Sequence, residues 1–202
     1  ALYSARKLSL IEKPFIAFHV SGGTTDCLYC EPCNDGLLKI TELGTSLDLK
    51  AGQAVDRVGL MLGLRFPCGK ELEKLAMKSN RKWKVKPVIK NGSCCLSGLE
   101  NQCKKLISDG VSKEDTALYC LKTIEVTIAA MTKEAVLKTG DIPIVYAGGV
   151  MSNKLIRASF EREFGAFFAE PEFSCDNAAG TAVYAAIMNG GMKCGDINNF
   201  TA

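Results

Sequence analysis

Two apolar stretches that each run into a pair of glycines constrain the fold of this chain more than any other feature. Phe15 to Val20 reads FIAFHV and precedes Ser21-Gly22-Gly23, and Ile142 to Tyr146 reads IPIVY and precedes Ala147-Gly148-Gly149. A short, nearly continuous apolar run is typical of a buried strand. A glycine pair after it lets backbone N–H groups approach a ligand closely. The two strand ends therefore either grip a ligand such as a nucleotide or simply make tight turns.

The rest of the chain predicts an α/β fold around these two strands. Apolar and turn patterns place two more strands directly after the first, a short one near the C-terminus, and helices between the later strands. The expected strands are Asp26 to Glu31, Leu37 to Leu43 and Ala166 to Ala169, and the expected helices are Asp48 to Leu64, Lys113 to Thr139, Met151 to Phe164 and Asp176 to Asn189. This order predicts a ribonuclease-H-like lobe of the actin/Hsp70 ATPase type, with a mixed five-stranded sheet and helices on both faces.

The same patterns predict the domain organisation. Residues 1–12 have the character of the tail of an amphipathic helix, ended by Pro14, and their start in mid-helix indicates a missing N-terminal lobe. Residues 13–190 form the expected lobe, in which about 70–112 is a less regular helical insertion. Residues 191–202 are rich in glycine and asparagine and are expected to form a flexible tail.

Composition excludes several classes of protein. The chain has 202 residues, of which 47% are hydrophobic, so it can bury a sizeable core and is not intrinsically disordered. A net charge of +3 is too mild to indicate a nucleic-acid-binding domain, although a local basic patch could suffice. Ten cysteines without a secretory segment indicate reduced thiols in a cytoplasmic protein. No apolar run reaches the roughly 18 residues of a membrane helix.

Several polar residues have two interpretations. Asp176 precedes a helix and is either an N-cap or a metal ligand. Asp56, beside Arg57 in a helix, fits a solvated face, and Asn153 in a first helical turn fits bonding to the local backbone. His19 is the only histidine and is flanked by apolar residues, which favours a core or sheet-facing side chain over a base.

Cysteines at Cys27, Cys30 and Cys33 have a spacing that invites a metal-cluster interpretation. A cluster or zinc site needs further cysteines nearby, and none follows. Cys27 and Cys30 also fall on opposite faces of a regular strand, so metal binding there is disfavoured.

The segment Lys78 to Lys90 carries six basic residues around Trp83 and no acidic residue. Basic residues interleaved with an aromatic ring can bind RNA phosphates and stack a base. The alternative is a solvated insertion loop, and the sequence leaves both open.

Five segments together resemble the family of tRNA adenosine threonylcarbamoyltransferases, also filed as glycoprotease-like or M22 peptidase proteins. The resemblance covers about Pro14 to Gly190 and is carried by FIAFHVSGGTT, LDLKAGQAVDRVGLMLGLRFPCG, SCCLSGLENQ, IVYAGGVMSNKLIR and SCDNAAGTAVYAA. It implies the C-terminal lobe of a divergent member. The family transfers a threonylcarbamoyl group from its adenylate to the exocyclic amine of a tRNA adenine.

The resemblance implies a site for an adenine nucleotide, either ATP or the threonylcarbamoyl-adenylate. Its residues are Val20, Ser21, Gly22 and Gly23 around the phosphate and carbamoyl groups, Asp56 and Glu73 at the ribose hydroxyls, Gly69 and Asn153 at the adenine and ribose, and Asp176 as a metal ligand. An upstream histidine pair would complete an iron or zinc site in the family, and magnesium could accompany the nucleotide. The implied partners are tRNA and accessory proteins, including an actin-fold paralogue, and a homodimer is a further expectation.

The chain departs from the family pattern at the expected site. The departures are Thr24 for the usual histidine, Lys50 and Gln53 for usual acidic residues, Cys68 for a glycine and Glu100 for a lysine. Two hypotheses therefore remain: a transferase lobe that is inactive alone, and a non-catalytic paralogue that keeps the fold for partner binding. A metallopeptidase is a third, but the chain has no His-Glu-x-x-His motif.

Overall fold

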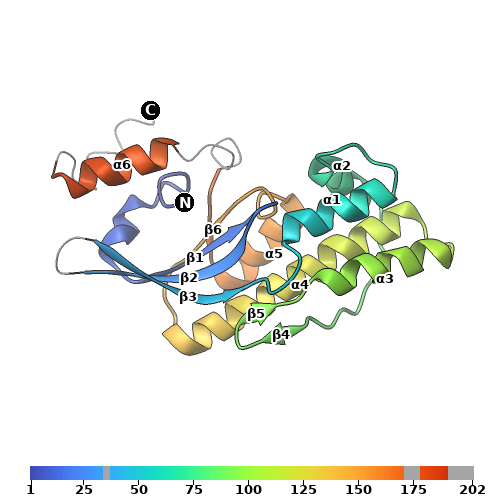
Figure 1. The fold of residues 1–202 in the computed structure, drawn as a ribbon, viewed down its shortest axis with the longest axis horizontal. Coiled ribbons are helices and arrows are strands. Elements are labelled where there is room, and N and C mark those ends of the chain that lie inside the picture. Colours follow the sequence, from blue (N-terminus) through green and yellow to red (C-terminus); the bar gives the residue numbers. More distant parts are fainter. Residues whose placement is uncertain (34–36, 171–177, 191–202) are drawn as a thin grey trace.

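A five-stranded mixed sheet forms the centre of the molecule (Figure 1). The computed structural model describes residues 1–33, 37–170 and 178–190. The sheet has the order β3-β2-β1-β6-β7, and its strands are β1 (Phe15–Val20), β2 (Thr25–Pro32), β3 (Leu38–Thr45), β6 (Ile144–Ala147) and β7 (Phe167–Phe168). The pairs β1·β2 and β2·β3 are antiparallel, whereas β1·β6 and β6·β7 are parallel. The predicted mixed sheet is confirmed.

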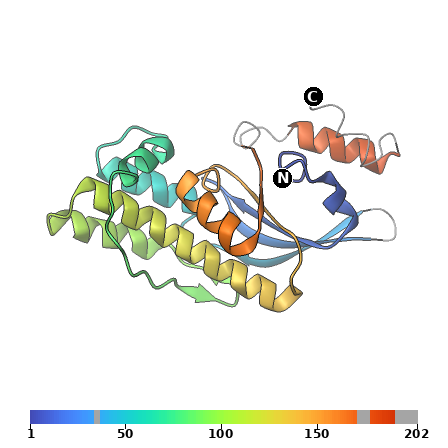
Figure 2. The same ribbon diagram turned by 180° about the vertical axis from the view of Figure 1, so that it is seen from behind.

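Helices cover both faces of this sheet, as predicted (Figures 1 and 2). In the described residues the helices are the 3-10 helix η1 (Leu8–Glu12), α1 (Ala51–Met61), α2 (Gly69–Ala76), α3 (Ser97–Ser108), α4 (Lys113–Thr139), α5 (Lys154–Phe164) and α6 (Ala178–Met188). A short hairpin of β4 (Ile89–Lys90) and β5 (Ser93–Cys94) lies between α2 and α3. Helix α4 has the predicted bounds, because Ser112 caps its start by accepting a hydrogen bond from the N–H of Asp115 and Gly140 ends it at φ 83°.

Side chains that alternate between the two faces of the sheet form two separate hydrophobic cores. Ile16 and Phe18 are fully buried against α1, α4 and α5, whereas Phe15 points to the other face and packs with η1 and α6. Tyr146 lies at the centre of the first core, where its ring stacks on Phe18 with centroids 4.9 Å apart. Its hydroxyl lies 2.6 Å from Thr132 Oγ1 in α4, so the one polar atom of this ring is satisfied.

Two segments differ from the sequence-based expectation. The helix predicted for residues 1–12 is a 3-10 helix over Leu8–Glu12 only, because Arg6 takes a positive φ of 53° that interrupts a helical path. Within the insertion, predicted to be less regular over about 70–112, residues 97–108 form the regular helix α3, which buries Leu99 and Cys103 in the first core. Its N-terminus is capped from a distant loop by Asp48, a contact that local sequence does not reveal.

Among the described residues, no helix is both long and apolar enough to cross a membrane.

Candidate functional site

The two glycine turns meet at one edge of the sheet. Parallel pairing of β1 with β6 places His19 opposite Ala147, so both strands end side by side. The N–H of Val150 then donates to Val20 O at 3.2 Å. Gly148 has φ +100°, and a Cβ placed on it would lie 2.3 Å from Val20 O. Only glycine fits there, so this contact fixes the two turns against each other.

Helix α1 begins against the first turn. The N–H of Gly52 donates to Ser21 O at 3.0 Å, and the N–H of Ala51 donates to Thr25 Oγ1 at 2.9 Å. A Cβ on Gly52 would lie 2.5 Å from the amide nitrogen of Gly22, so the helix can approach this closely only because residue 52 is glycine. Two N–H groups of the first helical turn are thereby satisfied by the protein itself.

Three other glycines have no packing reason to be glycine. A Cβ on Gly22, Gly23 or Gly149 would meet nothing within 4 Å. All three are exposed, and within the described part of the chain the N–H groups of Gly22 and Gly149 make no hydrogen bond. Exposed backbone donors beside a helix N-terminus form a surface suited to an anionic group.

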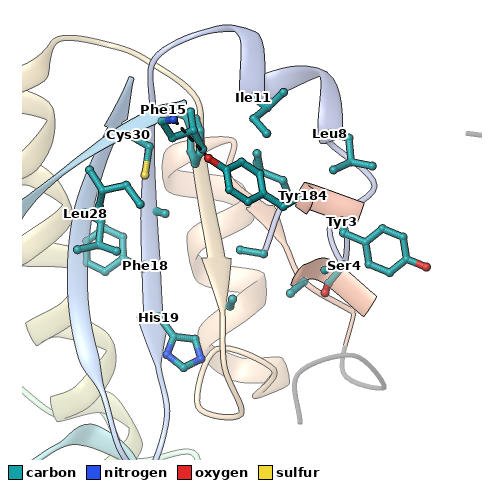
Figure 3. A pocket seen from close by; sticks show the side chains of 18 of the residues that line it. Tyr3, Ser4, Leu8, Ile11, Phe15, Phe18, His19, Leu28, Cys30 and Tyr184 are labelled. Carbon is teal, nitrogen blue, oxygen red and sulfur yellow. Dashed lines mark hydrogen bonds between the residues drawn. The ribbon is translucent and has the colours of Figure 1, made fainter. Parts of the chain in front are cut away.

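Side chains hold the first turn in a defined shape. Ser21 Oγ accepts hydrogen bonds from the N–H groups of Gly23 and Thr24, each at 3.2 Å, and lies 3.0 Å from Thr24 Oγ1. Thr24 Oγ1 in turn contacts Nδ1 of His19. His19 is exposed and lies on the sheet face rather than in the core (Figure 3). The hydroxyl groups of Ser21 and Thr24 and the imidazole of His19 therefore hold the backbone of this turn in one conformation.

Asp56 and Glu73 connect α1, α2 and α5. Asp56 lies one helical turn after Gly52, and its Oδ1 accepts a hydrogen bond from the N–H of Cys68 at 2.8 Å, just before Gly69 begins α2. Glu73 Oε1 accepts from the N–H of Lys154 at 2.6 Å, at the start of α5. Asp56 therefore anchors a loop instead of only facing solvent, and both carboxylates lie half-buried.

Asn153 is the N-cap of α5. Its side chain is largely buried, and Oδ1 accepts hydrogen bonds from the N–H groups of Leu155 at 3.0 Å and Ile156 at 3.3 Å. The sequence-based expectation of local backbone bonding is confirmed. Its Nδ2 donor makes no hydrogen bond within the described ranges, so the amide can serve as a cap and still offer a donor.

The described candidates, of which Val20 is fully buried, thus belong to one connected region. Val20, Ser21, Gly22 and Gly23 lie at its amide-rich end, beside Gly148 and Gly149, while Asp56, Gly69, Glu73 and Asn153 lie where α1, α2 and α5 meet. Backbone N–H groups attract anions, and carboxylates accept hydrogen bonds from hydroxyl groups. A ligand with a phosphate at one end and hydroxyls at the other matches this arrangement.

Cys68 occupies the position where the family pattern has a glycine. A Cβ on Gly59 would lie 2.2 Å from Cys68 Cβ, so Cys68 packs directly on the surface of α1. Burial raises the pKa of the Cys68 thiol, and the nearby charges of Asp56 and Glu71 raise it further. The thiol stays protonated near neutral pH, which makes it a poor nucleophile.

Metal binding is supported by no cluster in the described residues. Asp176 lies outside these residues, and the chain holds a single histidine. No group of three or more His, Cys, Asp or Glu side chains in the described ranges could hold an ion. Cys27 and Cys30 lie in separate cores, as predicted from strand alternation, and burial raises their pKa values to about 12 and about 11.

A cavity of about 680 Å³ lies on the second face of the sheet (Figure 3). Mostly apolar side chains from the N-terminal segment, the sheet and α6 line it, including Leu8, Phe15 and Tyr184. It reaches the turns only at His19, Ala147 and Gly148, and none of the eight described candidate residues lines it. This cavity therefore borders the glycine turns at Gly148 but lies on the other side of the sheet from the candidate residues of α1, α2 and α5.

Sequence reasoning missed two residues that position the site. Gly52 belongs to no motif that indicated a site, although a glycine in a first helical turn can signal a close approach. Asp48 accepts hydrogen bonds from the N–H groups of Leu49, Leu96 and Ser97 at 2.5, 2.7 and 3.2 Å and from Ser97 Oγ at 2.6 Å. It thereby ties the loop before α1 to the start of α3. No local pattern could have indicated that contact.

Comparison with known proteins adds an independent result. A family model described as tRNA N6-adenosine threonylcarbamoyltransferase matches residues 1–183. A curated protein of that description from Neorickettsia sennetsu is 32% identical over 200 residues, which cover 92% of this chain and 59% of that protein. The chain therefore spans less than two thirds of this relative.

Two solved structures share the fold at 17% sequence identity. The activator of the 2-hydroxyisocaproyl-CoA dehydratase from Clostridium difficile, with bound ADPNP, matches with a TM-score of 0.55 over 98% of this chain and 68% of its own. Component A of the (R)-2-hydroxyglutaryl-CoA dehydratase from Acidaminococcus fermentans matches with a TM-score of 0.56 over 91% and 66%. Both support an actin/Hsp70-type ATPase fold.

Proposed function

Because this chain belongs to the tRNA N6-adenosine threonylcarbamoyltransferase family, we propose that it is the nucleotide-binding lobe of a protein of tRNA threonylcarbamoyladenosine synthesis. The reaction would transfer threonylcarbamoyl from its adenylate to the exocyclic amine of a tRNA adenine. The observation that carries the proposal is the family match over residues 1–183, which includes both glycine turns. The ligand would be ATP or the threonylcarbamoyl-adenylate.

The geometry of the surface supports a role for each candidate residue. The exposed amides of Gly22 and Gly149 would bind the phosphate and carbamoyl end, and Gly23, whose N–H donates to Ser21 Oγ, leaves open space beside them. Asp56 and Glu73 would accept hydrogen bonds from the ribose hydroxyls with the carboxylate oxygens that the loop and α5 leave available. The remaining role, shaping the adenine and ribose pocket, falls to Gly69 and Asn153. A structural neighbour of this fold holds ADPNP, which agrees with a nucleotide ligand.

The chemistry would be electrostatic. Backbone N–H groups aimed at the carbamoyl carbonyl would stabilise the negative charge that develops on its oxygen as the tRNA amine attacks. No covalent nucleophile is required, and the protonated Cys68 thiol offers none. Asp176 would contribute one ligand to a divalent metal, iron or zinc, which would act as a Lewis acid when bound. Its partner histidines are absent from this sequence, and the transfer reaction would require the remainder of the protein.

Calorimetric titration of this chain with ATP, with and without magnesium, tests the nucleotide site. Saturable binding that weakens at least about tenfold in Gly23→Ala or Ser21→Ala is expected, because a methyl group or a lost hydroxyl disturbs the amide surface. Gly98→Ala is the matched control, since Gly98 is also exposed with nothing within 4 Å. Equal affinity of all three variants and the unchanged chain would contradict the site assignment.

A non-catalytic, partner-binding role is the second candidate, and Lys50 and Gln53 favour it. The Nζ of Lys50 donates to Ser46 O at 2.9 Å, and Gln53 Oε1 accepts from the N–H of Lys50 at 3.4 Å. Both side chains thus stabilise the start of α1, where the family pattern has acidic residues. Accessory proteins of the pathway, an actin-fold paralogue or a second copy would be the partners. Rescue of a strain that lacks its own transferase by the full-length gene would exclude this candidate.

A further inference from the structure

The segment of residues 78–90, here called the basic strap, connects α2 to the β4–β5 hairpin and crosses α4 (Figure 2). Its six Lys and Arg residues are accompanied by no acidic residue. The whole chain carries a net charge of +3, so the other residues together carry −3. The net positive charge of the chain therefore arises from this one segment.

The basic strap is held in place although residues 79–88 form no regular secondary structure. Trp83 Nε1 donates to Asp115 O at 3.1 Å, and its ring meets the Tyr119 ring edge-on with centroids 4.9 Å apart. Ser79 Oγ donates to Asp115 Oδ1 at 2.6 Å, and at the other end the N–H of Cys95 donates to Val88 O at 3.1 Å. These contacts fix both ends and the middle of the segment on α4 and the hairpin.

The attachment of Trp83 corrects one interpretation of this segment. The guanidinium of Arg81 covers the indole ring at 4.1 Å, Tyr119 meets it edge-on, and the indole nitrogen is hydrogen-bonded. The ring serves as an anchor and is not free to stack on a base.

Exposure alternates residue by residue along the strap. Trp83, Val85, Pro87 and Ile89 are half-buried, whereas Lys82, Lys84, Lys86, Val88 and Lys90 are exposed. In an extended chain, alternate residues lie about 6.4–6.8 Å apart on one side. The exposed lysines therefore form a row of regularly spaced cations. None of them takes part in an ion pair within the described part of the chain.

We propose that this lysine row binds the phosphate backbone of RNA. A row of cations on a fixed backbone suits a polyanion, because each ammonium group releases counterions from a phosphate when it binds. A protein partner would need an apolar or aromatic centre, and the apolar side chains of the strap, apart from Val88, turn toward the protein. The groove of about 430 Å³ beside Pro87 adds one net positive charge, that of Arg162, since Lys122 and Lys133 in its wall are paired with Glu125 and Glu163.

The inference rests on the proposed function in naming tRNA as the RNA, and it adds where the lobe would contact it. The strap starts five residues after Glu73, so RNA bound there would approach the α2 side of the candidate site. Its lysines would position the RNA without reading its sequence.

Fluorescence anisotropy with labelled, unmodified tRNA at several salt concentrations tests the proposal on this chain. The variant Lys82→Gln/Lys84→Gln/Lys86→Gln should bind roughly a hundredfold more weakly at 0.1 M salt, because each lost phosphate contact removes about 0.7–0.9 from the slope of log K against log salt. The control Lys7→Gln/Lys13→Gln/Lys39→Gln removes the same charge from the two ends of η1 and from β3, outside the strap. It should bind nearly as the unchanged chain does, and Lys82→Arg/Lys84→Arg/Lys86→Arg should retain binding.

Several outcomes would overturn the proposal. Equal weakening in both glutamine triples would mean that only net charge matters. The proposal would be refuted directly if the unchanged chain showed no salt-dependent binding of tRNA. It would also be refuted if the glutamine variant of the strap lost binding to anionic phospholipid vesicles but bound tRNA as well as the unchanged chain does. ATP titration of the same variant separates this proposal from the proposed nucleotide site. Unchanged ATP affinity together with weakened tRNA binding would support RNA binding by the strap. If neither the unchanged chain nor any variant bound ATP, only the proposed nucleotide site would be contradicted.

Discussion

Replacing Gly52 with alanine tests whether the start of α1 is pressed against the first glycine turn. Gly52 and Gly98 each occupy the second residue of a helix, α1 and α3. Alanine is favoured over glycine in helices by up to about 1 kcal/mol, so propensity alone predicts that both substitutions stabilise the chain. A Cβ on Gly52, however, would lie 2.5 Å from Gly22 N and 2.6 Å from Ser21 C, whereas one on Gly98 would meet nothing within 4 Å.

The expected difference between the two variants follows from that clash. Overpacking against the backbone costs about 1–3 kcal/mol, which Gly98→Ala does not incur. Because about 1 kcal/mol shifts Tm by roughly 2–4 °C in a domain of this size, Gly52→Ala should melt roughly 2–12 °C below Gly98→Ala. Its affinity for ATP should also fall, because the turn must move away from α1.

Thermal unfolding followed by circular dichroism measures this difference, with the unchanged chain as reference. If Gly52→Ala were stabilised as much as Gly98→Ala, the first glycine turn would move to accommodate a methyl group without any loss in the free energy of unfolding. The close approach of α1 would then not be what holds the amide-rich surface in shape, and the reasoning would fail.

Three further substitutions test other contacts. Burial alone would raise the pKa of Asp48, but hydrogen bonds from Ser97 and from the N–H groups of Leu96 and Leu49 outweigh it and lower the pKa. The stabilisation is therefore present at neutral pH and lost as the pH falls through the folded pKa, below the usual value near 4. Asp48→Asn should lower Tm at pH 7 and flatten its acid dependence, whereas Asp109→Asn should not; parallel curves would refute this. Tyr146→Phe should cost about 0.5–1.5 kcal/mol, because it removes the buried hydrogen bond to Thr132 Oγ1, which still donates to Ile128 O, and denaturant unfolding should show a smaller loss for Tyr29→Phe. Trp83→Phe removes the hydrogen bond to Asp115 O and should speed tryptic cleavage within the strap; an unchanged rate would show that the indole does not anchor it.

Much of the secondary structure could be predicted because it follows from local pattern. Strand β1 has the bounds of its apolar run, and α4 begins and ends at its serine cap and its glycine. The predicted order of strands and helices also indicated a mixed sheet, since a short connection makes neighbouring strands antiparallel and a helical one makes them parallel. The separation of Cys27 from Cys30 likewise follows from the two-residue period of a strand.

The site was predicted in part. Motif order indicated Ser21, Gly22 and Gly23, and Asn153 at a helix start indicated a cap, which the structure confirms. Whether these residues hold a nucleotide remains a proposal. The contacts of Asp56 with Cys68 and of Glu73 with Lys154 could not be foreseen, because they join residues 12 and 81 positions apart in the chain.

The sequence by itself determined most of the strands and helices and which turns carry paired glycines, because hydrophobic period and backbone freedom are local properties. Only the tertiary structure decided what each glycine does. Gly52 and Gly148 are required by atoms of Ser21, Gly22 and Val20, whereas Gly23 and Gly149 face open space. It also decided that Trp83 is an anchor and that the lysines beside it face solvent. Contacts between distant segments depend on how the sheet and helices pack, and no local pattern encodes them.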